Sequence, residues 1–492
     1  MSLIPSPNDL LAILPILILS GGGILLLGMQ FFFQGSEFRI IRFTSGLILV
    51  FAFVSLIASH FFLPGVGNYF GGHYEIGNLG FWFSSLYLIM AFGTILASPR
   101  VLEQHNMEFP EFYPLLLFSV VGMFLMTSGT DTVTIFVGLE LMSVSLYVLV
   151  GMARSDVFSL EASLKYFLLG SFSTGFFLLG MAFLFGGSGT THLQESLKPL
   201  SIAGFESNFT KIGLLLLLTG IAFKIALFPY HSWTPDAYEG ALTPVTGFMA
   251  TASKSASMGL LMVVFSKLPS PVANGEWAWI MGILAFLSMT YGNFVALQQS
   301  SLKRVLAYSS IAHAGYVVAG VSLGCEKEAI FYLIVYSFMS LGAFALLSFL
   351  EEGDKHVTYE SIAGLAKTRP WTSLALFLFF LSLAGIPPLG GFWAKLFLFQ
   401  RIADNGNAIG RLLLIGGIAN SALALYYYVK VGISAYMSST DGEISQVSPP
   451  KTSYGVVFVS AFCLMAVVFG WYFLQPKDLT SLRFNKSAEL RK

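Results

Sequence analysis

The sequence predicts an all-helical integral membrane protein that crosses the bilayer about fourteen times. Of its 492 residues, 55% are hydrophobic and only 11% are charged, and the mean hydropathy is +0.75. A soluble domain carries about 25% charged residues. Apolar stretches of roughly 18 or more residues recur along the chain, and helices of that length satisfy their own backbone hydrogen bonds in lipid. The 26 Lys and Arg residues balance the 26 Asp and Glu residues, so no basic surface indicates a nucleic-acid partner.

The apolar segments give the expected helices in order along the chain. In the first half they lie near 9–33, 41–63, 77–97, 112–129, 132–152, 160–186 and 210–230. In the second half they lie near 243–266, 276–297, 303–323, 328–350, 372–402, 408–437 and 453–475. The first run follows no basic n-region and is expected to stay as a span.

An internal repeat relates residues about 170 positions apart. Glu161-Ala162 matches Glu328-Ala329, and Lys224 matches Lys395. The offset covers five helices, and an odd number of spans gives the two copies opposite orientations in the membrane. Chance resemblance between apolar helices is the alternative. The repeat divides the chain into N-terminal helices (1–111), a first repeat region (112–297), a second repeat region (298–437), and a last helix with its tail (438–492).

Glu140 lies about midway along the fifth expected helix, in a stretch without other charges. A charged side chain at that depth costs about 2.5–3.5 kcal/mol on insertion scales, so it is expected to be paired and to mark a transport pathway. Its expected partner is Lys224 in the seventh helix. A structural ion pair that only fixes helix packing is the alternative for both residues.

Pro229 is expected to interrupt the helix that carries Lys224, because proline has no N–H for the carbonyl four residues earlier. His231 follows Lys224 by two helical turns, and histidine titrates in the physiological range, which suits a proton relay. The alternative is an interfacial hydrogen-bonding histidine beside Trp233.

Two more lysines fit the same pattern. Lys254 lies in a hydroxyl-rich span, whose small residues allow close helix packing and whose hydroxyls can hold water. Lys395 follows Pro387 and Pro388, which predict a second broken helix. The alternatives are a snorkelling Lys254 and a kink that serves packing only.

Lys165 and His313 are possible members of the pathway. Lys165 lies four residues after Glu161, which is also the spacing of an ordinary surface pair. His313 stands among hydroxyl side chains and is either part of a polar lining or a packed, hydrogen-bonded histidine.

Four stretches resemble the antiporter-like membrane subunits of respiratory complex I, a family shared with Mrp-type cation/proton antiporters. They are FKIALFPYHSWTPDAYEG (223–240), LKRVLAYSSIAHAGY (302–316), AGIPPLGGFWAKLFLF (384–399) and Gly-Leu-Glu-Leu around Glu140. In the family, a glutamate and a lysine of helices five and seven form a coupled pair, a lysine of helix eight continues the proton route, and a charge on helix twelve ends it. The resemblance implies these roles for Glu140, Lys224, Lys254 and Lys395.

Among the members of this family, the chain most resembles the N-type subunit of NADH:quinone oxidoreductase. The tail after Pro476 is too short for the lateral helix of the L-type subunit, and the M-type subunit usually has glutamate at the position of Lys395. The D subunit of Mrp antiporters is the alternative, followed by an inert scaffold and a solitary solute transporter.

The resemblance implies a multi-pass subunit of the bacterial inner membrane that translocates protons and assembles with other membrane subunits of complex I. NADH, FMN, iron–sulfur clusters and quinone are then expected in partner subunits. The residues agree, because the chain has no Rossmann glycine motif after a strand, and Cys325 and Cys463 form neither a cluster nor a metal-ligand spacing. We therefore expect no cofactor site, no metal site and no redox chemistry in this chain alone.

Overall fold

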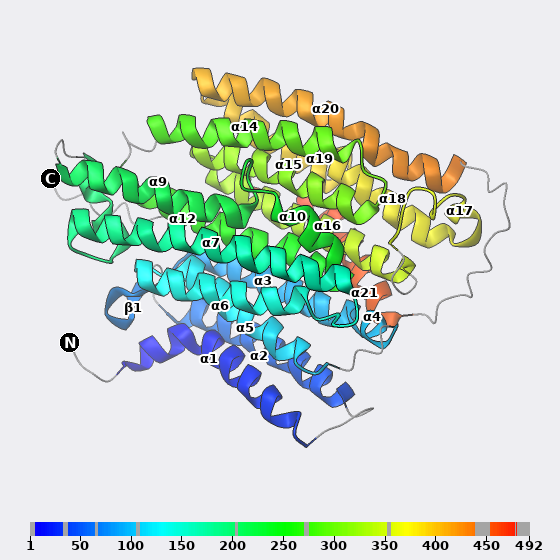
Figure 1. Ribbon diagram of the computed structural model, residues 1–492, viewed down its shortest axis with the longest axis horizontal. Coiled ribbons are helices and arrows are strands. Elements are labelled where there is room, and N and C mark those ends of the chain that lie inside the picture. The colour runs from blue at the N-terminus through cyan, green and yellow to red at the C-terminus, as the bar shows by residue number, and fades with distance from the viewer. Residues whose placement is uncertain are drawn as a thin grey trace.

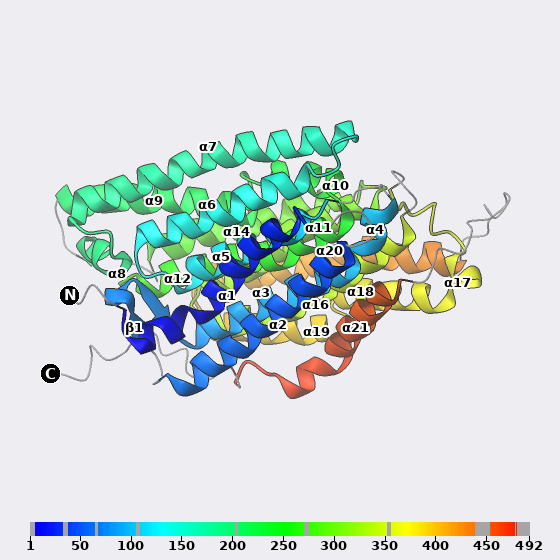
Figure 2. The ribbon, with the colours of Figure 1, turned by 90° about the horizontal axis from the view of Figure 1, so that it is seen from below.

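The helices of the computed structural model run side by side along one common direction (Figures 1 and 2). The structure describes residues 5–32, 38–63, 67–104, 109–201, 205–269, 275–351, 356–437, 453–477 and 479. The polar segment 438–451 and most of the tail after Pro476 lie outside these residues. The architecture is nearly all-helical, as expected.

The N-terminal group consists of α1 to α4 and a two-stranded hairpin. A capping box starts α1: the Asp9 N–H donates to the Ser6 side chain, and the Ser6 N–H donates to the Asp9 carboxylate. Asp9 also accepts the Phe70 N–H at 2.8 Å, which ties α1 to the hairpin. The bounds are α1 Pro7–Met29, α2 Phe38–Phe62, β1 Gly67–Tyr69, β2 Tyr74–Ile76, α3 Asn78–Ala97 and α4 Pro99–Gln104.

The first repeat region begins with two closely packed helices. A Cβ added at Gly122 would lie 2.4 Å from the carbonyl oxygen of Gly138, so only glycine permits this approach. The elements are α5 Phe112–Ser128, α6 Thr132–Val150, α7 Val157–Ser188, α8 Leu193–Ser196, α9 Phe205–Ile225, α10 Trp233–Gly240, α11 Thr243–Phe248 and α12 Lys254–Lys267. One turn of π-helix, Met249–Ser253, joins α11 to α12.

The same order begins again at α14, before the expected boundary at residue 298: two closely packed helices, a long helix and a broken helix. A Cβ added at Gly315 would lie 2.6 Å from the carbonyl oxygen of Ala285, so α14 and α15 approach as α5 and α6 do. The elements are α14 Glu276–Ala296, α15 Leu302–Ser322, α16 Glu326–Leu350, α17 Leu365–Thr368, α18 Pro370–Ala384, α19 Gly390–Asp404 and α20 Ala408–Met437. The last helix is α21, Tyr454–Phe473.

The expected number of fourteen spanning helices is not confirmed. Within the described residues, twelve helices are long and apolar enough to cross a membrane. The helix expected near 112–129 has only 17 residues in α5. The span expected over 372–402 is divided into α18 and α19, each of 15 residues, because Gly385 and two prolines interrupt it. The second of the two expected breaks accounts for this part of the difference.

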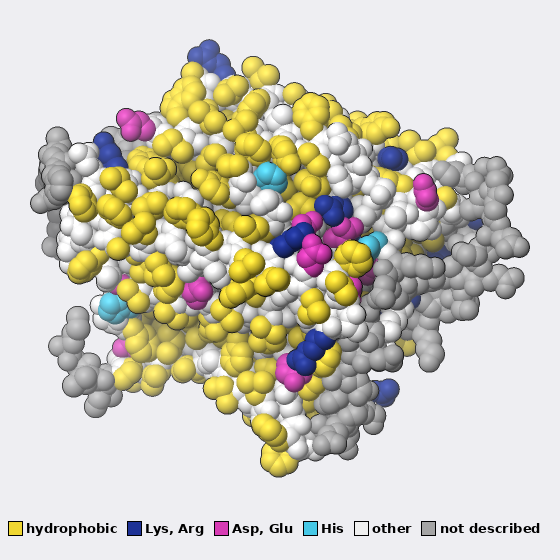
Figure 3. Space-filling model, viewed as in Figure 1, with side chains coloured by type: hydrophobic (Ala, Val, Ile, Leu, Met, Phe, Trp, Pro, Cys, Tyr) yellow, Lys and Arg dark blue, Asp and Glu magenta, His cyan; other side chains and the backbone are white. Residues whose placement is uncertain are grey.

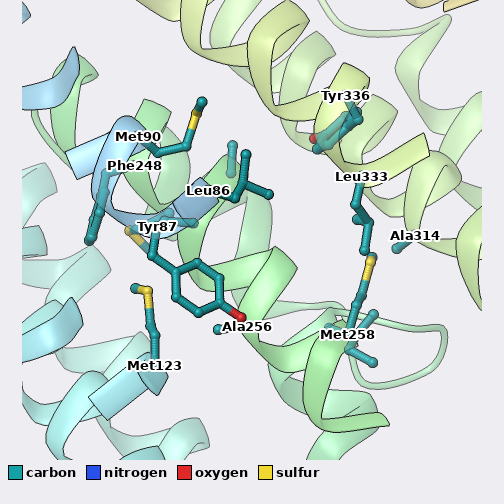
Figure 4. Close-up of a cluster of buried hydrophobic side chains, with 14 of the residues drawn as sticks. Leu86, Tyr87, Met90, Met123, Phe248, Ala256, Met258, Ala314, Leu333 and Tyr336 are labelled. Atoms are coloured by element: carbon teal, nitrogen blue, oxygen red, sulfur yellow. The ribbon is translucent and has the colours of Figure 1, made fainter. Parts of the chain in front are cut away.

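The centre of the molecule is formed by helices of both repeat regions. The most apolar window of Thr243–Lys267 is 100% buried and that of Leu302–Ser322 is 94% buried, against 28% for Tyr454–Phe473. Figure 4 shows buried side chains such as Tyr87, Phe248 and Leu333 gathered in this core. The positions of Lys254 and His313 on the two central helices therefore place both residues away from lipid.

Candidate functional site

The first helix break lies between α9 and α10. Lys224 is in the last turn of α9, Ala226 has a φ of 65°, and Pro229 follows a cis peptide bond. The indole N–H of Trp233 donates to the Phe223 carbonyl at 2.9 Å, which satisfies one acceptor at the helix end. The protein itself thus stabilises the non-helical stretch beside Lys224.

The second helix break, between α18 and α19, resembles the first, but here a lysine side chain caps the end of the preceding helix. After α18 ends, Gly385 takes a φ of 89°, and the Pro387–Pro388 bond is cis. The Lys395 ammonium, on α19, donates to the carbonyls of Leu383 at 3.1 Å and Ala384 at 2.9 Å. These are the last carbonyls of α18, where a cation also interacts favourably with the helix dipole.

Glu140 and Lys224 do not form the direct ion pair that the sequence suggested. The half-buried Glu140 accepts a hydrogen bond from the Thr174 hydroxyl at 2.8 Å. The Lys224 ammonium donates to the Ser143 hydroxyl at 2.7 Å and to the Tyr147 hydroxyl at 3.0 Å. Residues 140, 143 and 147 share one face of α6, since they are spaced by three and four residues. Glu140 and Lys224 therefore adjoin the same helix face and are separated by hydroxyl groups.

His231 lies in the first break and packs against aromatic rings. Its ring centroid is 5.4 Å from that of Phe228 and 4.4 Å from that of Tyr291. Nδ1 of His231, Oγ1 of Thr234 and the hydroxyl of Tyr238 are all buried and have no hydrogen-bond partner among the residues that the structure describes. Buried polar groups are nearly always satisfied, so three such groups at helical spacing mark a polar zone.

Lys254 is buried in the centre, with 1% of its surface exposed. Its ammonium donates to the Ser310 hydroxyl of α15 at 2.7 Å and lies 6.0 Å from the centroid of the Tyr238 ring. It forms no ion pair with any carboxylate of the described residues. The π-helical turn that precedes Lys254 was not expected from the sequence, although such turns are frequent at functional sites.

His313 lies between Lys254 and Lys395, within Coulombic range of both. One ring nitrogen is 2.7 Å from the Tyr332 hydroxyl, and the other is 3.1 Å from the Tyr428 hydroxyl. The structure therefore places His313 beside the charged residues, with both ring nitrogens hydrogen-bonded.

Lys165 lies outside the buried row, on the surface. It pairs with Glu161 at 2.7 Å and with Asp236 at 3.0 Å, and its side chain is 47% exposed. The network continues to Arg304, which also bonds Glu239 at 2.5 Å. Figure 3 shows charged side chains gathered near the centre of a largely apolar face, in the region of α7 and α10.

Sequence reasoning missed most of the hydroxyl residues that contact the charged ones, although it placed Ser310 in a possible polar lining around His313. Hydroxyl side chains are common within apolar helices, so only the packing of α6, α7, α16 and α20 identifies the others. They are Ser143, Tyr147, Thr174, Tyr332 and Tyr428. A buried pair was missed as well: the Lys303 ammonium lies 3.7 Å from Glu351 and donates to the Ala241 carbonyl at 2.8 Å.

Comparisons with known proteins identify the family of this chain. A family model described as NADH:quinone oxidoreductase/Mrp antiporter, TM, matches residues 129–419. A relative from Leptospira interrogans serogroup Icterohaemorrhagiae serovar Lai (strain 56601), named NADH-quinone oxidoreductase subunit N, is 59% identical, and the match covers 98% of this chain and 94% of the relative.

Two solved structures have a similar fold. A chain in respiratory complex I from Thermus thermophilus with bound aureothin is 31% identical, with a TM-score of 0.75 over 93% of this chain and 97% of that one. A chain in the Mrp complex from Dietzia sp. DQ12-45-1b has a TM-score of 0.81 over 97% of each chain, but its 18% identity supports similarity of fold only. The family model matches more than half of the chain, and the expectation from the sequence motifs is confirmed. The chain belongs to the NADH:quinone oxidoreductase/Mrp antiporter family of membrane-spanning subunits.

Proposed function

We propose that this chain is a proton-translocating membrane subunit of an NADH:quinone oxidoreductase in the bacterial inner membrane. One observation carries the proposal: four ionisable side chains from separate helices form a row through the protein, and two of them adjoin helix breaks. The row consists of Glu140, Lys224, Lys254 and Lys395. Ionisable residues within a membrane are costly and mark ion pathways by default.

In the proposed pathway, hydroxyl groups connect the charged residues. Ser143 and Tyr147 bridge from the helix of Glu140 to Lys224. A hydroxyl both donates and accepts a hydrogen bond, so it can pass a proton from one neighbour to the next. The unpartnered polar atoms of His231, Thr234 and Tyr238 lie on the segment that continues from Lys224, and polar sites of this kind suit bridging water.

The second half of the pathway runs through the centre of the molecule. Lys254 reaches Ser310, and His313 lies within Coulombic range of Lys254 and of Lys395. Both nitrogens of His313 already contact tyrosine hydroxyls, so the imidazole can take a proton on one side and release one on the other. Lys395 then holds its charge against the carbonyls at the end of α18.

Electron transfer from NADH to quinone would take place in partner subunits that hold the NADH, FMN, iron–sulfur clusters and quinone. Protons would then move through this chain in response to conformational or electrostatic changes that reach it from those partners. The two repeat regions, 112–297 and 298–437, would each supply one broken helix, and residues 1–111 and 438–492 would flank them.

The alternative is a D-type subunit of an Mrp cation/proton antiporter. The similar fold of the Dietzia chain favours it only weakly, because that chain is 18% identical. The name of the 59% identical relative favours the redox enzyme.

The proteins that copurify with this chain in mild detergent distinguish the two functions. A redox complex predicts flavin- and iron–sulfur-containing partners and NADH-dependent quinone reduction by the purified assembly. An antiporter predicts other antiporter subunits without flavin, and that result would contradict the proposal.

A further inference from the structure

A groove lies on the lateral surface of the molecule. The interior of the protein separates it from the first helix break. Its lining includes none of Glu140, Lys224, Lys254 and Lys395. Its walls are α2 and α21 and its floor is formed by α3 and α16, which lie side by side in Figure 2. The groove encloses about 250 Å³. Its lining is apolar and includes Phe53, Ile89, Leu341 and Phe462. Phe462 is 48% exposed, so the groove opens to the surroundings of the protein.

Two arginines lie on the same face of α2 as the residues that line the groove. Leu49, Val50 and Phe53 line the groove. Arg42 precedes Leu49 by seven residues and Arg39 precedes Val50 by eleven, so all five side chains project from one face of the helix. The guanidinium groups therefore lie about two to three helical turns beyond the apolar lining, towards the start of α2.

A third arginine lies at the same end of the groove. The imidazole of His60 stacks on Phe81 at 4.2 Å, and a Cβ on Gly46 would lie 3.6 Å from Phe92, so α2 and α3 run antiparallel. The start of α2 therefore lies beside the end of α3, where α4 carries Arg100.

A fourth guanidinium, that of Arg369, lies at this end of the groove, beside the floor helix α16. The Arg100 Cζ lies 4.5 Å and the Arg369 Cζ lies 5.7 Å from the centroid of the Phe349 ring, which is near the end of α16. Among the described residues of α4 and of the start of α5, Glu103 and Glu111 carry the opposite charge. Within the described residues, these four arginines exceed the two glutamates and give this end of the groove a net positive charge.

We propose that the groove binds one acyl chain of an anionic phospholipid whose phosphate lies among Arg39, Arg42 and Arg100. A helix with its side chains is about 10–12 Å wide and rises about 5.4 Å per turn, so one turn occupies roughly 400 Å³ or more. This exceeds the groove volume of about 250 Å³, whereas a section of a narrow hydrocarbon chain fits. Basic clusters at the ends of membrane helices attract anionic headgroups, and an apolar groove that continues from such a cluster accepts the attached chain. The site is independent of the proposed proton pathway.

The test uses the assembled complex, extracted in mild detergent and exchanged into lipid that contains phosphatidylglycerol, phosphatidylcholine or both. Native mass spectrometry then counts the phospholipids that stay on this chain. The unmodified chain should keep a phosphatidylglycerol molecule in preference to phosphatidylcholine. Combining Arg39→Gln with Arg42→Gln should lower that preference roughly tenfold to thirtyfold, since each basic residue near a membrane surface contributes about 1 kcal/mol.

Filling the groove provides the second arm of the test. Val50 is 46% exposed and lines the groove, so Val50→Trp should occupy the space of the acyl chain and remove the bound lipid. Val457, 51% exposed, faces away from the groove on α21, so Val457→Trp is the matched control and should keep the lipid. If Val50→Trp prevents assembly, Ile89→Phe replaces it.

Three results would overturn the proposal. The first is equal lipid retention by a groove-filling variant and Val457→Trp. The second is binding of phosphatidylcholine as tightly as phosphatidylglycerol by the unmodified chain. The third is crosslinking of a partner's helix, or of a second copy of this chain, to groove residues.

Discussion

At the scale of single residues, the lysines of the row are held by hydroxyl and carbonyl oxygens, and no carboxylate of the described residues pairs with them. Lys224 contacts Ser143 and Tyr147, and Lys254 contacts Ser310. A lysine in a direct ion pair can lose its proton only by leaving a buried carboxylate uncompensated, which is costly. A lysine bonded to a hydroxyl has no such constraint. This arrangement favours proton transfer over a purely structural role.

The first prediction concerns Glu140 and Lys224 as a coupled unit. Glu140→Gln and Lys224→Ala should each lower proton translocation by about tenfold or more, because proton transfer by a positioned group contributes on the order of 10²–10⁴-fold. The double variant should be no worse than the more damaging single one, since residues that act as a unit are not additive. Translocation is measured with assembly confirmed. Independent, multiplicative losses would show that the two residues act separately.

The second prediction concerns the hydroxyl that contacts Lys224. Ser143 and Ser145 both donate to the carbonyl four residues earlier on α6, but only Ser143 also accepts from Lys224. Ser143→Ala should slow translocation by roughly threefold to tenfold, the equivalent of one hydrogen bond. Ser145→Ala should leave the rate unchanged. Initial rates of proton uptake by sealed membrane vesicles check both variants, and equal rates for the two would remove Ser143 from the pathway.

At the scale of elements, the helix breaks were predictable and the turn before Lys254 was not. Proline has no N–H and glycine favours positive φ, so the sequences around Pro229 and around Gly385 indicate interrupted helices. The π-helical turn Met249–Ser253 contains neither residue type and depends on the packing of its neighbours. Glu140 and Lys224 make no direct contact. The cost of a charge in the membrane predicts that it needs a partner but not whether that partner is a charge or a hydroxyl.

The third prediction tests the close packing of the second break. A Cβ added at Gly391 would lie 1.8 Å from the carbonyl oxygen of Ser382, so α19 can approach the end of α18 only with glycine there. Gly391→Ala should destabilise the assembled subunit by about 1–3 kcal/mol, the usual cost of overpacking. Gly175→Ala on α7 is the control, because nothing lies within 4 Å of its added Cβ. Thermal unfolding in detergent compares the two, and an unchanged midpoint for Gly391→Ala would mean that α18 and α19 are not packed as described.

At the scale of the whole molecule, the fold class followed from composition, and the members of the proposed row were selected as the few charges in apolar helices. A charge in lipid has a high energetic cost, so its presence in the sequence is a strong signal. Hydroxyl residues are common in apolar helices, so the sequence does not show which of them contact the charged residues. The hairpin Gly67–Ile76 is too short to be recognised from its sequence. Family membership, expected from four motifs, was confirmed by comparison with known proteins.

The fourth prediction concerns which subunits of the complex carry out the redox chemistry. The rigorously isolated chain should neither oxidise NADH nor reduce quinone, because none of the described side chains can accept a hydride or store an electron. Absorbance assays of NADH oxidation with a quinone acceptor test this. Turnover that persists after all partner subunits are removed would contradict the assignment of redox chemistry to those partners.

The central claim is that the buried row carries the translocated protons, and Lys254 tests it most directly because it joins the two halves of the row. The measurement is the number of protons moved per NADH oxidised in sealed vesicles that contain the assembled complex. Lys254→Met should lower this ratio, or stop coupled turnover, while assembly persists. Lys211→Met, at an exposed position of α9, should leave the ratio unchanged. An unchanged ratio and rate in a fully assembled Lys254→Met complex would contradict the account.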